Sequence, residues 1–201
     1  MISYNARFMG SAIAMSLTSL FLLVAGAAYA GGGMDPVEKD TVGVFDPANE
    51  NFFLTNTNAA GAAAVAVSFG PSDSVPAVGD FDASGSDAVG VYSPSSGTFY
   101  LNNTNVEGVA DTTVRFGPRN STLTPLIGTW DGLGTDTIGL YESVSGRFLL
   151  RNSLTPGIGE IVTRFGPKNS TLVPLAGNWT GAGAADGIGL YDPATGSFYL
   201  R

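Results

Sequence analysis

The chain has 201 residues, with 17 acidic and 9 basic side chains, a formal net charge of −8, and neither Cys nor His. These absences exclude disulfides, Cys or His nucleophiles, His acid–base pairs and ordinary zinc sites, so an enzyme would depend on carboxylates, Tyr, Lys and Arg. The acidic balance also disfavours nucleic-acid binding, which needs a basic patch to neutralise phosphates.

Residues 1–30 differ from the rest of the chain and predict a helical signal peptide. An uncharged apolar run occupies residues 8–28, and the segment ends in the sequence Ala28-Tyr29-Ala30. Small residues at the first and third of these positions suit signal peptidase, so we predict cleavage after Ala30. A retained membrane anchor is the alternative, because about 20 apolar residues can span a bilayer. Residues 31–39 are expected to be a linker.

Residues 40–201 contain about three and a half copies of one unit of roughly 48 residues, and a period of this size indicates a solenoid or a propeller. The clearest motif is an Asp followed by two small or aliphatic residues, a Gly, an aliphatic residue and an aromatic one. It begins at Asp40, Asp87, Asp136 and Asp186, with separations of 47, 49 and 50 residues. The predicted repeats are 40–86, 87–135, 136–185 and, in part, 186–201.

Each full copy contains four short segments rich in β-branched and aromatic residues and bounded by turn-forming residues, which is the pattern of strands between turns. After the motif come an aromatic triplet such as residues 99–101, a Phe-Gly-Pro segment such as residues 116–118, and a segment that ends in Gly, such as residues 123–128. No helical spacing survives across these turns. We therefore predict an all-β, β-propeller-like array of tandem four-stranded antiparallel blades.

The central glycine of the motif, for example Gly90, suggests that this strand is the innermost one of its blade, where the loss of Cβ lets neighbouring backbones approach. A bulge in an ordinary β-sandwich is the alternative. The aromatic residues that recur with the period are expected to form the core between blades. The tyrosines that end the motif are instead expected at the exposed rim, as candidate ligand contacts: Tyr92, Tyr141 and Tyr191.

The loop before the second motif has oxygen-bearing groups at regular positions: Asp80, Asp82, Ser84, Ser86 and Asp87. With its Gly at the sixth position and the adjoining Gly-Val-Tyr strand, it resembles the calcium-binding hairpin of FG-GAP and VCBS-type bacterial repeat proteins, and the strand motifs extend this resemblance over all the repeats. Membership would imply a calcium-stabilised extracellular β-propeller used in adhesion or carried beside a secreted enzyme. Because Ca²⁺ takes six to eight oxygens, these five residues are candidate ligands, Ser86 through its carbonyl.

The later loops have fewer oxygen ligands. The second keeps Asp131 and Asp136 but has Leu133 at a ligand position, so calcium should bind more weakly there. The third retains one carboxylate, Asp186, and we expect no metal in it. At every loop, a tight turn in which Asp side chains accept backbone N–H bonds is the alternative.

The repeats show no catalytic constellation, and we predict an exported, secreted or periplasmic, non-catalytic module. It would bind a protein or a glycan, act in adhesion, or serve as a structural scaffold, with calcium as its candidate structural ion and no membrane span after signal cleavage. The alternative is an accessory domain or fragment of a secreted glycoside hydrolase, in which acids such as Asp80 and Asp82 would act as acid and base.

The last copy holds two of the four expected strands, which predicts half a missing blade after Arg201. Closed propellers have about four to eight blades. We therefore expect a fragment of a longer protein, with an open array or closure by other chains as alternatives. The last strands would leave an exposed edge.

Overall fold

The structure is a computed structural model that describes residues 21–25, 41–179 and 185–201. Within these ranges the chain forms 15 β-strands and no helix. The strands belong to four antiparallel sheets. The predicted all-β class is therefore confirmed, and none of the described segments supplies a helix able to cross a membrane.

The strand order follows the chain within each sheet. The first sheet contains β1 (Phe21–Ala25), β2 (Thr41–Asp46), β3 (Asn51–Leu54) and β4 (Val65–Ser68). The second contains β5 (Val75–Gly79), β6 (Ala88–Ser93), β7 (Thr98–Leu101) and β8 (Thr112–Arg115). The third contains β9 (Thr124–Gly128), β10 (Thr137–Glu142), β11 (Arg147–Leu150) and β12 (Ile161–Arg164). The fourth contains β13 (Val173–Gly177), β14 (Gly187–Asp192) and β15 (Ser197–Leu200).

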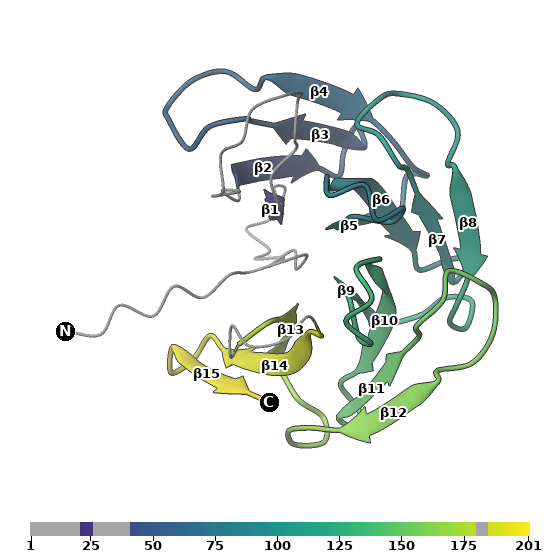
Figure 1. Ribbon diagram of the computed structural model, residues 1–201. Helices are drawn as coiled ribbons and strands as arrows, with labels where there is room; N and C mark the ends of the chain where they lie inside the picture. The colour runs from purple at the N-terminus through teal and green to yellow at the C-terminus, as the bar shows by residue number, and fades with distance from the viewer. Residues whose placement is uncertain (1–20, 26–40, 180–184) are drawn as a thin grey trace.

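The four sheets lie one after another along an arc, with β1, β5, β9 and β13 facing its centre (Figure 1). These inner strands contact one another from sheet to sheet: β1 lies against β5, β5 against β9, and β9 against β13. The arc does not close into a barrel or a complete propeller ring.

The sheets are offset from the predicted repeats. β5 pairs with β6, with Val75 opposite Tyr92, so the strand that ends one copy is the inner strand of the next sheet. Two predictions are thus wrong. The motif strand is the second strand of its sheet, and the last sheet has three strands where the repeat count gave two. The reason is that the loop between β5 and β6 closes an antiparallel hairpin, whereas the Phe-Gly-Pro segment crosses to the next sheet.

The glycine of the motif strand makes room for side chains. A Cβ on Gly90 would lie 2.8 Å from a Leu101 methyl carbon and 3.2 Å from the ring of Phe81. Gly139 has the same relation to Trp130, whose ring would lie 3.2 Å from the added carbon. An aromatic ring from the preceding loop therefore covers the Cα of this glycine.

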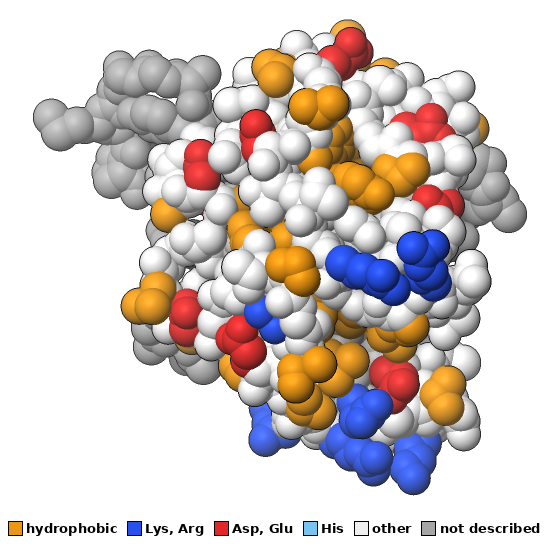
Figure 2. Space-filling view, turned by 90° about the vertical axis from the view of Figure 1, so that its right-hand side faces the viewer, with side chains coloured by type: hydrophobic (Ala, Val, Ile, Leu, Met, Phe, Trp, Pro, Cys, Tyr) orange, Lys and Arg blue, Asp and Glu red, His pale blue; other side chains and the backbone are white. Residues whose placement is uncertain are grey.

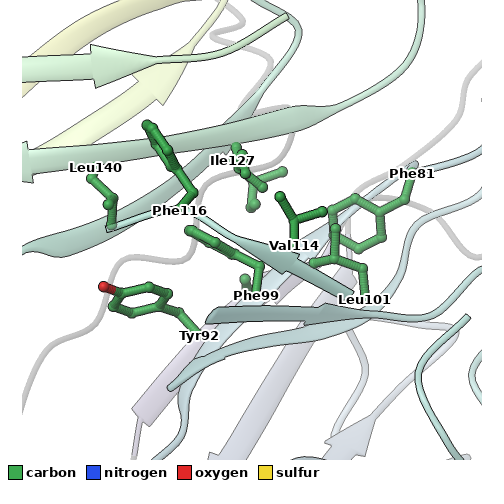
Figure 3. Close-up of a cluster of buried hydrophobic side chains, with 10 residues drawn as sticks. Phe81, Tyr92, Phe99, Leu101, Val114, Phe116, Ile127 and Leu140 are labelled. Carbon is green, nitrogen blue, oxygen red and sulfur yellow. The ribbon is translucent and has the colours of Figure 1, made fainter. Parts of the chain in front are cut away.

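The core consists of three apolar clusters, each between two successive sheets. Figure 3 shows the second cluster, in which Phe99 and Leu101 of one sheet face Leu140 and Ile127 of the next. The prediction of core aromatics is confirmed for Phe52, Phe69, Phe99, Phe116, Phe148 and Trp130. Phe165 and Trp179 are half-buried. Phe198, on the last sheet, is wrongly predicted, because it is 53% exposed.

Strand β1 lies inside the segment predicted to be a signal peptide. It pairs with β2 so that Leu23 is opposite Gly43, the register in which Ala77 of β5 is opposite Gly90. Over these five residues a strand replaces the expected helix. The remainder of residues 1–30 and the linker 31–39 lie outside the described residues.

Candidate functional site

The loops of the array are divided between two ends. Because neighbouring strands run in opposite directions, the loop after an inner strand and the loop after the third strand of a sheet lie at one end, called here the loop end. The side-chain amide of Asn105 ties these two loops together, since its oxygen accepts from the Val89 N–H at 2.9 Å and its nitrogen donates to the Asp87 carbonyl at 3.0 Å. The tight turns, such as residues 94–97, lie at the opposite turn end.

The candidate calcium loop after β5 is held by its own carboxylates. Asp80 accepts the backbone N–H groups of Ser84 and Gly85 at 2.9 and 2.7 Å. Asp82 accepts the same Ser84 N–H at 3.1 Å, and hydrogen bonding by Ser84 lowers the pKa of Asp82. The Ser84 hydroxyl lies between Asp80 and the carbonyl of Ser86. The loop thus brings Asp80, Asp82, Ser84 and Ser86 together around backbone donors.

The second and third loops each place their last acid against the preceding sheet. In the second loop, Asp131 accepts the N–H of Leu133 at 3.0 Å. The carboxylate of Asp136 accepts the backbone N–H of Asp80 at 2.9 Å, and the Asp136 N–H donates to the Asp80 carbonyl at 2.8 Å. Asp136 is therefore part of a contact between the second and third sheets.

Asp186 makes the equivalent contact one sheet further on. Its carboxylate accepts the N–H of Thr129 at 2.9 Å, and its N–H donates to the Thr129 carbonyl at 2.8 Å. We call these two paired contacts the Asp clasps. The glycine that ends each inner strand makes them possible, since a Cβ on Gly79 or Gly128 would lie 2.8 or 2.9 Å from the clasping carboxylate.

Burial of the clasps perturbs their acid–base properties. Desolvation raises the pKa of Asp136 to about 7, with a further increase from the nearby acids Asp87, Asp186 and Asp80. Desolvation likewise raises the pKa of Asp186 to about 6. Both carboxylates are nevertheless hydrogen-bonded to backbone across a sheet junction, so the perturbed pKa values belong to packing contacts.

Metal binding at these loops stays a prediction. Among the described residues, no three carboxylates converge in a way that could hold a metal ion. Residues 180–184 of the third loop lie outside the described residues. The N–H bonds from Ser84 and Gly85 use only part of the acceptor capacity of Asp80 and Asp82, because each carboxylate has about four lone-pair sites, so these bonds are compatible with a calcium ion on the same carboxylates.

The tyrosines expected at the rim are mostly buried. Tyr92 and Tyr141 are 0% and 1% exposed, and each ring packs against a Phe of the next strand, Phe99 and Phe148, at 4.7 and 4.6 Å between centroids. Their expected exposure is thus wrong, because the packing of the next sheet covers the motif strand to its end. Only Tyr191, in the last sheet, is partly exposed.

Other side chains are well exposed at the loop end. The loops after β7 and β11 present Val109 and Ile158, which are 91% and 85% exposed, and the second acidic loop presents Leu133, which is 81% exposed. The sequence pattern missed these residues because they occur in the segments where the copies differ most. Exposed apolar residues in otherwise polar loops were the available signal.

The surface charge is unevenly distributed. The stretch 41–110 has no Lys or Arg, so every cation of the described residues belongs to the second half of the chain. Figure 2 shows two groups of Lys and Arg side chains on the side of the molecule that faces the viewer. Arg151 is the buried exception, and it contacts Glu160 at 3.2 Å within its own loop.

No family model, no curated protein and no solved structure matches this chain.

Proposed function

We propose that this chain is an exported, non-catalytic module with an open propeller-like array of sheets, which binds a protein or a glycan through its loop end. The observation that carries the proposal is the use of Asp136 and Asp186 in the Asp clasps. An enzyme without His or Cys depends on carboxylates, Tyr, Lys and Arg, and carboxylates with raised pKa values are its first candidates for acid–base work. In this chain the two acids with strongly raised pKa values support the joints between sheets.

The loop end offers a binding surface of mixed character. Val109 and Ile158 project from equivalent loops of neighbouring sheets, and both are almost fully exposed. The same loops carry acids within two residues of these side chains, namely Glu107, Asp111 and Glu160. Loops held by a rigid set of sheets are a common way to present a recognition surface. A partner with apolar or sugar-ring faces and neutral or cationic groups would complement this surface.

The alternative, a role in glycoside hydrolysis, is less well supported. Asp80 and Asp82 belong to one loop at the loop end, but both accept the N–H of Ser84. A general acid needs a raised pKa, and hydrogen bonding lowers that of Asp82. Their geometry suits a tight turn better than a pair of groups on either side of a glycosidic bond.

The test measures binding to an array of immobilised glycans and polysaccharides, together with hydrolysis of the same compounds. The double variant Val109→Ser and Ile158→Ser should weaken binding at least about tenfold, because each substitution removes an apolar side chain that the bound partner would bury. Val144→Ser is the matched control, since this valine is 63% exposed but lies at the turn end. Hydrolysis that disappears in Asp80→Asn would contradict the proposal, as would equal binding by the double variant and the control.

A further inference from the structure

Every sheet junction inside the chain uses the same two kinds of surface. The face of a sheet that looks toward the next sheet, its leading face, carries the Phe and Leu of the third strand, such as Phe52 and Leu54. The face that looks back, its trailing face, carries aliphatic residues of the motif strand, such as Val89 and Val91. The clusters at the second and third junctions repeat this arrangement.

The first and last sheets each expose one of these faces. On the leading face of the fourth sheet, Phe198 is 53% and Leu200 is 48% exposed. The residues at the same positions of the second sheet, Phe99 and Leu101, are both 0% exposed. The fourth sheet therefore presents a core-forming face without the sheet that covers it elsewhere.

The first sheet has the converse exposure. On its trailing face Val42 is 45% and Phe53 is 36% exposed. Val89 and Ile138, which stand at the position of Val42 in the next two sheets, are 0% exposed because the preceding sheet covers them. The described array of sheets thus has an exposed apolar face on its first sheet and another, of the opposite kind, on its fourth sheet.

We propose that a second copy of this chain packs the trailing face of its first sheet onto the leading face of the fourth sheet. The three internal junctions show what covers a leading face, namely a trailing face of β-branched or aliphatic residues, and the first sheet carries one. The two surfaces differ, so the contact is heterologous, and further copies can add in the same direction.

The experiment measures the mass of the full chain in solution by light scattering and sedimentation over a range of concentrations. The wild type should form dimers and larger species with increasing concentration. Phe198→Asp places a charge on the leading face of the fourth sheet, and Val42→Asp places one on the trailing face of the first. Each variant alone should therefore be monomeric. Val144→Asp, a substitution of an exposed turn-end valine, should associate like the wild type.

A mixture of the two variants is the decisive arm. Each variant keeps the face that the other has lost, so the equimolar mixture should form a dimer of one copy of each and nothing larger. Unfolded variants could not restore this dimer, so recovery also shows that both fold.

Three results would overturn the inference: a monomeric wild type at every concentration, association of the wild type that persists in both single variants, or a mixture that stays monomeric. Association through the apolar run 8–28 would give the second of these results. The inference goes beyond the proposed function and does not depend on glycan or protein binding at the loop end. A monomer that still binds through Val109 and Ile158 would overturn the inference alone.

Discussion

Replacing Asp136 with Asn tests the energetic role of the Asp clasps. Burial raises the pKa of Asp136 from an ordinary value of 3.8 to about 7. Between these two values the folded chain holds a proton that the unfolded chain has released, so the free energy of unfolding falls as the pH rises from about 4 to about 7. The stability due to this proton is complete below the lower pKa and lost above the higher one. The difference between the two pKa values corresponds to about 4 kcal/mol.

Asp136→Asn keeps an oxygen that can accept the Asp80 N–H bond but carries no charge. We expect its stability to equal that of the wild type near about pH 4 and to exceed it by up to about 4 kcal/mol near about pH 8. Urea unfolding, followed by the fluorescence of Trp130 and Trp179, measures the free energy of unfolding of the wild type and of the variant at each pH. Asp131→Asn, which replaces an exposed acid of the same loop, is the matched control and should not exceed the stability of the wild type. An Asp136→Asn variant that is less stable than the wild type at high pH, or that keeps the full wild-type slope, would refute this reasoning.

Three further predictions concern single positions or ions. Tyr141→Phe should leave stability unchanged or raise it by about 1 kcal/mol, because the buried Tyr141 hydroxyl has no hydrogen-bond partner among the described residues and Phe45 stands at the same position of the first sheet. A clearly lower melting temperature for this variant would contradict the prediction. Glu50→Gly should raise the melting temperature, since Glu50 has a φ of 52° where Gly97 has 69°, whereas Gly97→Ala should lower it, because the new Cβ would lie 2.6 Å from the Gly117 carbonyl oxygen. If the loop after β5 binds calcium, the melting temperature should be higher with calcium than with a chelator. Identical melting temperatures would contradict calcium binding.

The sequence by itself determined where most strands lie. The repeat period, the turn residues and the short apolar segments predicted strands such as β6, β7 and β9, and the structure has them at these places. This succeeds because strand formation depends on local features, namely β-branched and aromatic residues bounded by Gly, Pro and Asp. The core role of Phe99 and Phe148 followed from the same recurrence. The tight-turn alternative for the loop after β5 also rests on local chemistry, since Asp80 bonds to residues four and five positions later.

Only the tertiary structure decided which strand is innermost and which acids meet. A strand with apolar residues on both faces can pair with the strand before it or after it, so the repeat alone left the sheet boundaries ambiguous. The partner of Asp136 is 56 residues away in the chain, on the preceding sheet, and no spacing within one loop indicates it. The burial of Tyr92 and the exposure of Phe198 have the same cause. Identical motifs are buried or exposed according to whether another sheet packs against them, and that is a property of the array as a whole.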